Sequence, residues 1–179
     1  MERIYLDYNA TTPTRAEVVE AMLPYFGKYY GNPSSVHTFG QQTRAVVDDA
    51  RAQLAELIGA KETAEIVFTA GGTEADNYAI KGTIFTRLAE KLAHPPQIIT
   101  TMIEHHAVLT TCEYLAKQFG VEVVYLKVDQ YGLVNPSDVE AAVTSETVLV
   151  SIMHGNNEIG TIEPVAKITA EFAPVTACA

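Results

Sequence analysis

The sequence predicts an α/β fold in which a mainly parallel sheet is flanked by helices. Short apolar runs rich in Ile, Val, Thr and Tyr alternate with stretches of helical periodicity, which is typical of sheets built from strand–helix–strand units. Three of the four runs are nearly continuous rather than alternating in polarity, which indicates strands covered on both faces. The apolar fraction of 47% is large enough to fill the core between such layers.

The expected strands are the four apolar runs, at residues 65–69, 97–103, 121–128 and 147–153. Helical spacing of apolar residues marks the segments between them. Glycine commonly stops a helix and proline suits its first turn, so these residues mark the helix ends. The expected helices are residues 43–58 before Gly59, residues 107–119 before Gly120, residues 135–143 with Pro136 in the first turn, and a last helix that begins at Pro164.

Length and charge exclude several classes of protein. A chain of 179 residues is expected to form one domain. Its 22 acidic side chains outnumber its 12 basic ones, and the formal charge of −10 argues against a nucleic acid as the main partner. The two cysteines are too few for a disulfide framework or a four-cysteine zinc site, so no metal centre is expected. Cys112 falls on an apolar helix stripe, where a packing role is expected.

The cellular location is predicted to be cytoplasmic, with no membrane partner. The N-terminus lacks the apolar segment of a secretory signal, and no apolar run approaches the roughly 18 residues of a membrane-spanning helix. The first forty residues differ from the rest, because segments 9–13 (NATTP) and 31–35 (GNPSS) are rich in turn-forming residues. Such composition suits an arm or a loop that lines a site.

Candidate sites follow the expected strands, because ligands of open α/β sheets bind beyond the carboxyl ends of the strands. Residues 70–76 (AGGTEAD) follow the first strand, and Thr73 is expected to cap a helix, with Asp76 three residues later. The N–H groups and positive dipole end of that helix would hold a phosphate. The segment is neither a dinucleotide fingerprint nor a Walker loop. An ordinary strand-to-helix turn remains the alternative.

The second strand is followed by the triplet 104–106 (EHH), and the fourth by residues 154–160 (HGNNEIG). His105 could stack on a flat ligand or move protons near neutral pH, although a buried or merely exposed histidine is the alternative. Asparagine amides could grip a ring hydroxyl or a carboxylate, although Gly and Asn also form plain turns. Three polar loops at one edge of the sheet together favour a planar ligand that carries a phosphate.

Five motifs in order, at similar spacing, resemble those of the cysteine desulfurases. These enzymes belong to the class-V aminotransferase group, which depends on pyridoxal phosphate. The resemblance runs from residue 4 to about residue 172, and it implies the large domain of a fold-type I pyridoxal-phosphate transferase, here an N-terminal part of it. The motifs are residues 5–13 (YLDYNATTP), 31–35 (GNPSS), 68–77 (FTAGGTEADN), 104–105 (EH) and 151–160 (SIMHGNNEIG).

The resemblance implies an activity, a cofactor and partners. Cysteine desulfurases take sulfur from L-cysteine, which gives L-alanine and a persulfide on an enzyme cysteine. The persulfide supplies a sulfur-acceptor protein or the scaffold of iron–sulfur cluster assembly, and the full-length enzymes are homodimers. Pyridoxal 5′-phosphate is the implied cofactor, and it acts as an electron sink.

The resemblance also implies roles for four residues. Gly72 and Thr73 match the loop that binds the phosphate of the cofactor. His105 matches the residue that stacks on the pyridine ring and assists proton transfer, so it is the expected catalytic residue. Asn157 matches the group that bonds the ring oxygen, and no residue is expected to bind a metal.

The sequence departs from the family pattern after residue 172. The aspartate that pairs with the pyridinium nitrogen, the Schiff-base lysine and the nucleophilic cysteine have no counterpart in it. The expected organisation is an arm at 1–15, the first part of the cofactor domain at 16–172 and a divergent tail at 173–179, from a frameshift or an early stop. We expect the chain to be inactive alone. The alternatives are a non-catalytic truncated module, a selenocysteine lyase or another lyase of the same group.

Overall fold

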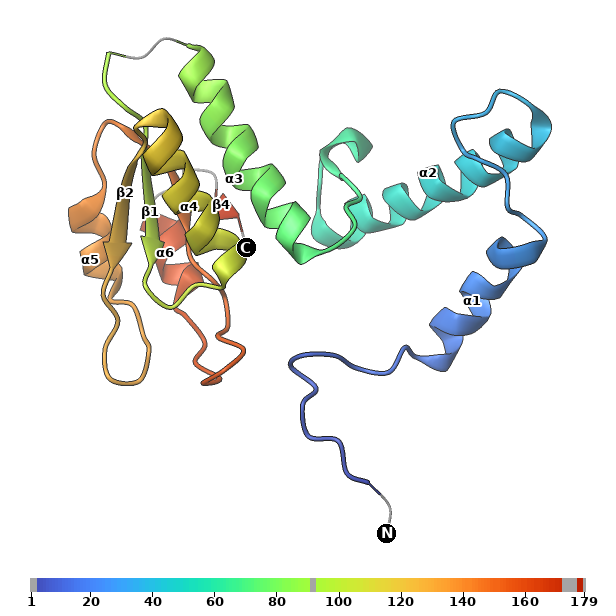
Figure 1. The fold of residues 1–179 in the computed structure, drawn as a ribbon, viewed down its shortest axis with the longest axis horizontal. Coiled ribbons are helices and arrows are strands. Elements are labelled where there is room, and N and C mark those ends of the chain that lie inside the picture. Colours follow the sequence, from blue (N-terminus) through green and yellow to red (C-terminus); the bar gives the residue numbers. More distant parts are fainter. Residues whose placement is uncertain (1–2, 91–92, 172–176, 179) are drawn as a thin grey trace. The chain divides into compact units, whose positions relative to one another are not determined.

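The computed structural model describes residues 3–90, 93–171 and 177–178, and the chain folds as two compact units, 1–68 and 69–179 (Figure 1). Most of the divergent tail predicted at 173–179 lies outside the described residues. Across the ranges that are described, no helix combines the length and apolar character needed to span a bilayer.

The first unit consists of helices joined by turns: α1 (Ala16–Gly27), α2 (Thr38–Ile58) and a 3₁₀ helix (Thr63–Glu65). Helix α2 begins five residues earlier than the apolar stripe predicted, because the His37 side chain accepts a bond from the Gly40 N–H and caps it. It ends as predicted at Gly59, whose φ of 71° favours glycine.

Segment 31–35 packs closely against the first turn of α2. A Cβ at Gly31 would lie 2.3 Å from the carbonyl oxygen of Phe39, so only glycine fits there. The hydroxyl of Thr43 donates a 2.7 Å hydrogen bond to the carbonyl oxygen of Gly31. The turn-rich composition of this segment therefore reflects a close approach between two pieces of backbone.

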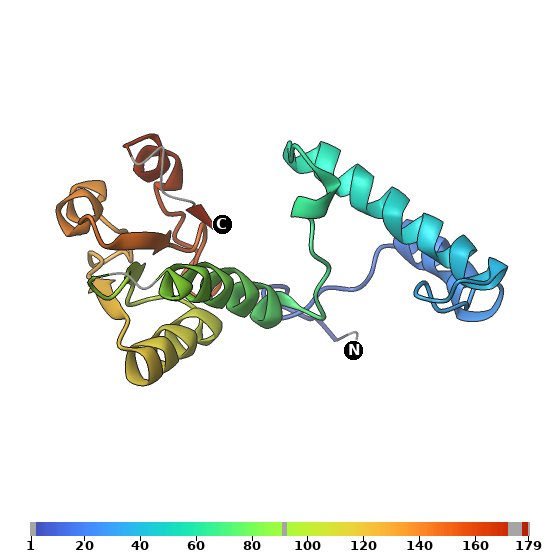
Figure 2. The same cartoon turned by 90° about the horizontal axis from the view of Figure 1, so that it is seen from above.

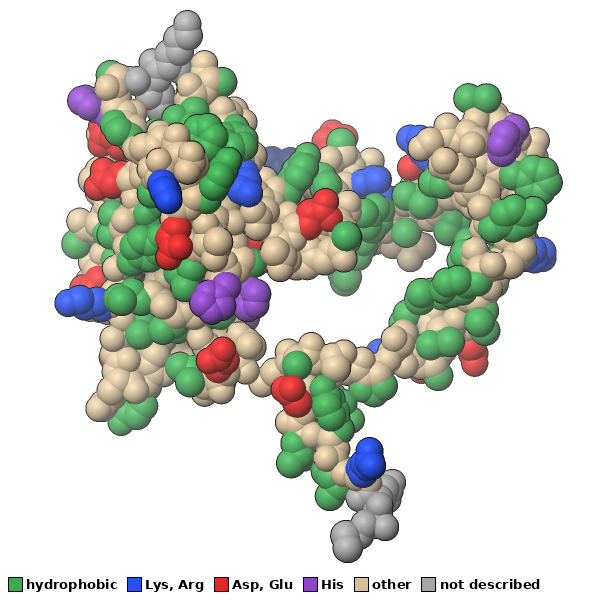
Figure 3. Space-filling view, in the orientation of Figure 1, with side chains coloured by type: hydrophobic (Ala, Val, Ile, Leu, Met, Phe, Trp, Pro, Cys, Tyr) green, Lys and Arg blue, Asp and Glu red, His purple; other side chains and the backbone are tan. Residues whose placement is uncertain are grey.

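Apolar side chains are widely exposed within the first unit taken by itself. Helix α1 has no buried residue, and Figure 3 shows hydrophobic side chains gathered along it. Leu6 and Val36 are 88% and 89% exposed, and Phe26 is 74% exposed. Exposed apolar side chains gathered on one helix, as on α1, usually mark a surface that another protein segment covers.

The strand predicted at residues 65–69 is wrong. Thr63–Glu65 form the 3₁₀ helix, and residues 66–69 belong to no strand in the described structure. The guanidinium of Arg51 donates a hydrogen bond to the carbonyl of Ile66 and lies 4.9 Å from the Phe68 ring centroid. A side chain thus binds a backbone acceptor that a neighbouring strand would have used, and an apolar run alone could not reveal this.

The second unit contains a parallel sheet of four strands. Three predicted strands are confirmed, each ending two residues earlier than expected, and Figure 1 shows the first two of them side by side. The fold prediction, an α/β structure with a parallel sheet flanked by helices, is confirmed with them. The strands are β1 (Gln97–Thr101), β2 (Glu122–Leu126), β3 (Thr147–Ser151) and the short β4 (Ala177–Cys178). Their order in the sheet is β2-β1-β3-β4.

Helices cover both faces of this sheet (Figure 2). On one face lie α3 (Gly72–Ala89) and α4 (His106–Phe119), and on the other lie α5 (Pro136–Ala142) and α6 (Val165–Glu171). In β1, Ile98 packs on the first face and Ile99 on the second, and both are fully buried. The nearly continuous apolar run of β1 follows from these two covered faces.

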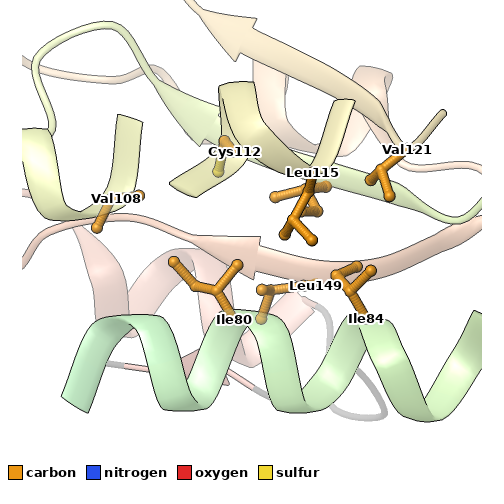
Figure 4. Packing of buried hydrophobic residues seen from close by; sticks show 8 residues of the cluster. Ile80, Ile84, Val108, Cys112, Leu115, Val121 and Leu149 are labelled. Carbon is orange, nitrogen blue, oxygen red and sulfur yellow. The ribbon is translucent and has the colours of Figure 1, made fainter. Parts of the chain in front are cut away.

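The cluster between α3, α4 and the sheet includes the buried thiol of Cys112 (Figure 4). The packing role predicted for Cys112 is confirmed, since the side chain is fully buried. Burial raises the pKa of this thiol to about 11, with smaller contributions from the charges of Glu104 and Glu113. The members of the cluster are Ile80, Ile84, Ile98, Val108, Cys112, Leu115, Val121 and Leu149.

Candidate cofactor site

The N-terminus of α3 is built differently from the predicted cap. Gly71 is the N-cap and makes no side-chain cap bond, so Thr73 lies inside the first turn and does not cap the helix with Asp76. Glu74 supplies the bond instead, because its Oε2 accepts a 2.6 Å hydrogen bond from the Ala70 N–H. The backbone is already helical at Gly72, whereas a cap at Thr73 would place the first helical residue at Glu74.

The first turn of α3 faces open space. A Cβ at Gly71 or at Gly72 would meet no atom within 4 Å, so neither internal packing nor a positive φ requires glycine at these positions. A cavity of about 500 Å³ lies here, lined by residues 70–74 and Asn77. The N–H groups of a first helical turn have no intrahelical partner, and they can therefore bind an anion in this cavity.

His105 is the N-cap of α4. Its Nδ1 accepts a 3.1 Å hydrogen bond from the Ala107 N–H, which assigns the proton of the neutral imidazole to Nε2. The side chain is exposed, and its ring lies beside that of His106, with 6.4 Å between the centroids. The ring orientation is thus fixed by the backbone, while Nε2 can contact a ligand.

The four predicted site residues line three adjoining cavities. Gly72 and Thr73 share the cavity at the start of α3. Thr73 and His105 share a second cavity of about 450 Å³. His105 and Asn157 share a third cavity of about 310 Å³. Thr73 links the first cavity to the second, and His105 links the second to the third. No one of these cavities is lined by all four residues.

Asn77 also lines the candidate site, and the residue-by-residue prediction did not include it. Its Oδ1 accepts a 2.9 Å hydrogen bond from the Thr111 hydroxyl, and its Nδ2 donates a 2.9 Å bond to the carbonyl of Thr73. Asn77 also lines both cavities that contain Thr73. Its position at the end of motif 68–77, one helical turn after Thr73, is the signal that could have identified it.

Two further residues, Glu104 and Asn156, join the loop after β1 to the loop after β3. Oε1 of Glu104 accepts a 2.6 Å hydrogen bond from the Met153 N–H and a 3.2 Å bond from the Thr101 hydroxyl. Nδ2 of Asn156 donates a 3.1 Å bond to the carbonyl of Ile103. We call the Glu104–Met153 and Asn156–Ile103 bonds the interloop clasp.

The carboxyl group of Glu104 is buried, with the residue only 8% exposed. Burial raises its pKa above the ordinary value of 4.5, whereas the bonds from Met153 and Thr101 lower it. The nearby charges of Asp76 and Glu163 act in the same direction as burial. The site therefore contains a carboxyl group that holds a proton more readily than a free glutamate does.

The cationic side chain at the second cavity is Lys81, whose Nζ lies 5.0 Å from the ring centroid of Tyr114. Within the described ranges, no three His, Cys, Asp or Glu side chains are grouped as ligands for a metal ion. The polar groups at these cavities are thus backbone N–H groups, hydroxyls, amides and imidazoles, together with Lys81, Glu74, Glu104 and Glu158.

Comparison with known proteins gives matches over nearly the whole chain. The profile of the family described as aminotransferase class-V matches residues 4–178. A cysteine desulfurase IscS of Dictyoglomus turgidum is 52% identical over 172 residues, which cover 94% of this chain and 42% of that protein. A cysteine desulfurase IscS of Methanosarcina thermophila is 52% identical over 165 residues, covering 92% of this chain and 39% of that protein. The chain thus spans about two fifths of the length of these curated relatives.

Solved structures give the same result for the fold. A NifS-like protein superposes with a TM-score of 0.87 at 37% identity, covering 98% of this chain and 48% of that one. SspA in complex with cysteine superposes with a TM-score of 0.86 at 38% identity, covering 97% of this chain and 49% of that one. The family resemblance expected from the five motifs is confirmed. This chain belongs to the aminotransferase class-V family, which is pyridoxal-phosphate dependent.

Proposed function

We propose that this chain forms the first part of the cofactor domain of a cysteine desulfurase. Such an enzyme takes sulfur from L-cysteine and leaves L-alanine, with the sulfur held as a persulfide on an enzyme cysteine. The observation that carries the proposal is the 52% identity over 94% of the chain to a relative named for this activity. The SspA structure, which contains cysteine, supports L-cysteine as the substrate.

The residues at the three cavities fit pyridoxal phosphate. The open first turn of α3 offers unpaired N–H groups to a dianionic phosphate, with no side chain at Gly71 or Gly72 to obstruct it. The exposed imidazole of His105 offers a flat surface to an aromatic ring, and Asn157 offers an amide to a ring oxygen. When bound, the cofactor supplies an electron sink for the electron pair released at the substrate α-carbon.

Each residue has a separate task under this proposal. Gly72 and Thr73 bind the phosphate through backbone N–H groups and, at Thr73, a hydroxyl. His105 orients the ring and exchanges a proton at Nε2, because its Nδ1 is occupied by the Ala107 N–H. The amide of Asn157 donates to the ring oxygen. These assignments follow the family motifs, and the shared cavities of Thr73, His105 and Asn157 support them.

The wider roles in this proposal concern partners and location. We infer that the whole protein is a cytoplasmic homodimer that passes sulfur to an acceptor or to a scaffold for iron–sulfur clusters. The IscS names of the relatives support the acceptor, and the exposed apolar side chains of α1 support a covered surface in the whole protein. A buried, protonated Cys112 suits a reducing compartment.

We further propose that the chain does not turn over L-cysteine alone. None of its seven lysines, at positions 28, 61, 81, 91, 117, 127 and 167, stands in the family motif for the lysine that binds the cofactor. Borohydride reduction after incubation with pyridoxal phosphate tests this directly. Scattered labelling or none is expected by peptide mass analysis, and a stoichiometric adduct on one lysine would contradict it.

Complementation tests the activity itself. The chain is co-expressed with the unmatched C-terminal part of the Dictyoglomus turgidum relative, and L-alanine formation from L-cysteine is measured with pyridoxal phosphate present. L-Alanine is expected from the pair and from neither part alone. A stable complex without L-alanine formation would contradict the proposal. Turnover of L-selenocysteine without turnover of L-cysteine would favour the selenocysteine lyase instead.

A further inference from the structure

The interloop clasp joins two loops that are distant in sequence by two hydrogen bonds, both donated by the loop after β3 and accepted by the loop after β1. The side chain of Glu104 binds the main chain at Met153, which is 49 residues away. The side chain of Asn156 binds the main chain at Ile103, which is 53 residues away. Each loop thus supplies one side chain and one backbone group to the other.

Two hydrogen bonds at separate points restrict the relative motion of the loops more than a single bond would. A single hydrogen bond would let the loops rotate about it, whereas the Met153 and Ile103 anchor points together fix both separation and orientation. The Glu104 carboxylate is nearly buried, and hydrogen bonds to a charged group are stronger than those between neutral groups. The clasp is therefore a stiff connection between the loop after β1 and the loop after β3.

The predicted ligand residues stand directly beside the clasp. His105 follows Glu104, and Asn157 follows Asn156, and both line the cavity of about 310 Å³ together with the two clasp side chains. The distance between the imidazole and the Asn157 amide is consequently set by the bonds of their sequence neighbours. The turn around Asn156 is fixed as well, because its Oδ1 accepts from the N–H groups of Glu158 and Ile159.

We propose that Glu104 and Asn156 are positioning residues that hold His105 and Asn157 at the spacing a planar, phosphorylated pyridine ligand requires. This inference rests on the proposed function, because it names what holds the ring-binding groups of that same site. Loss of the clasp should weaken ligand binding through geometry, since the clasp bonds use none of the groups assigned to the ligand.

Glu163 provides a matched control for the loss of a buried carboxylate. It is 3% exposed, and its Oε2 accepts a 2.9 Å hydrogen bond from the Val134 N–H. It belongs to the same segment after β3, but it lines none of the three cavities. Glu163→Ala should therefore cost stability in the same way as Glu104→Ala without separating the two loops.

The test uses pyridoxamine 5′-phosphate, which lacks the aldehyde and so does not react with surface lysines. Its dissociation constant is measured by fluorescence for the full chain and for the variants Glu104→Ala, Glu104→Gln and Glu163→Ala. Amide hydrogen exchange at Met153 is measured by NMR in the same proteins without ligand. If a variant does not remain soluble alone, both measurements are made on the complemented pair described above.

Glu104→Ala should weaken binding about tenfold or more and speed Met153 exchange by a similar factor, because a buried charged hydrogen bond is lost. Glu104→Gln retains an oxygen that can accept both bonds, so both values should return to within about twofold of the unmodified chain. Glu163→Ala removes a charge that acts on Glu104 but neither bond of the clasp, so both values should stay within the same about twofold range.

Two results would overturn the inference. One is a Glu104→Ala variant with faster Met153 exchange but unchanged affinity, and the other is an equal loss of affinity in Glu163→Ala. A failure of the proposed function has a different signature, because the unmodified chain would then bind no pyridoxamine 5′-phosphate at all. That result would remove the site and the inference together, whereas the first two leave the site standing.

Discussion

Asn77 on α3 and Thr111 on α4 are joined by a 2.9 Å hydrogen bond, and Thr111 is only 4% exposed. The bond lies where the two helices meet below the cavity that Thr73 and His105 share. It therefore couples the packing of α3 against α4 to the geometry of the predicted phosphate end of the site.

Substitution of Asn77 should destabilise the chain. Asn77→Ala leaves the buried Thr111 hydroxyl unpaired, which should lower the free energy of unfolding by about 1–3 kcal/mol. Thr111→Val removes the hydroxyl as well, so the double variant should recover part of the loss, with a coupling energy of about 1 kcal/mol. Urea unfolding of the four proteins measures this cycle, and strictly additive losses would contradict the coupling.

Gly72→Ala should separate folding from ligand binding. The added Cβ meets nothing in the protein and joins a helix, so stability should be unchanged or higher by up to about 1 kcal/mol. The same methyl group projects at the open first turn and should weaken pyridoxamine 5′-phosphate binding. Calorimetric titration measures the affinity and thermal unfolding the stability.

Gly82→Ala is the control for that variant. Gly82 lies on the same helix, its Cβ would also meet nothing within 4 Å, and it lines none of the three cavities. Its substitution should stabilise the helix and leave affinity unchanged. Equal affinities for the Gly72 and Gly82 variants would count against a phosphate at this turn.

The raised pKa of Glu104 predicts a specific pH dependence of stability. The folded carboxyl binds its proton more tightly than the unfolded one, so its favourable contribution is fully present below 4.5. That contribution is lost as the pH rises from 4.5 through the raised pKa. Glu104→Gln cannot ionise and should therefore become more stable relative to the unmodified chain over this window.

Urea unfolding midpoints between pH 4 and pH 7.5 measure the Glu104 effect. Asp76 and Glu163, the other carboxyls that raise this pKa, are present in both proteins, so the difference between the two curves reports on Glu104. A difference that does not change with pH would contradict the prediction.

Cys112 should resist alkylation in the folded chain. With a pKa of about 11, its thiolate fraction at pH 8 is roughly two hundredfold below that of a free cysteine, and burial blocks access as well. Iodoacetamide labelling followed by peptide mass analysis distinguishes Cys112 from Cys178. Rapid labelling is expected in urea, and labelling of Cys112 at the free-thiol rate without urea would refute its burial.

The exposed apolar side chains of α1 should make the isolated chain self-associate. Leu23 is 59% and Phe26 is 74% exposed, so replacing both by lysine should reduce association in sedimentation experiments. Ile162→Lys, at a 61% exposed position outside α1, is the control and should have little effect. An unmodified chain that is monomeric at all concentrations would contradict this expectation.

Sequence patterns correctly predicted the helices and strands that are determined by residues close together in the sequence. The continuous apolar run of β1 indicated a strand covered on both faces, and Gly59 and Gly120 marked helix ends where φ is indeed positive. The same reasoning gave a wrong strand at residues 65–69. There Arg51, 15 residues away in the sequence, binds the Ile66 carbonyl that a neighbouring strand would have used. The run looked identical to a strand in composition alone.

In the candidate site, too, local features could be predicted from the sequence and long-range contacts could not. His105 and Asn157 were predicted from their place after strands and from family motifs. The neighbouring Glu104 and Asn156 lie in the same motifs, but their clasp bonds could not be predicted, because these bonds cross 49 and 53 residues and leave no periodic signal. Thr73 looked like a helix cap by residue type, but the helix begins one residue before it, and Glu74 binds the preceding backbone instead.

The strand order has a consequence for when this site can form during synthesis. Strand β2 is made before β3 but lies on the opposite side of β1, so one edge of β1 has no neighbour until residues 147–151 leave the ribosome. Until then Glu104 has no Met153 amide to bind. The nascent chain therefore completes its helices α3 and α4 well before it can assemble the pair of loops that meets the ligand.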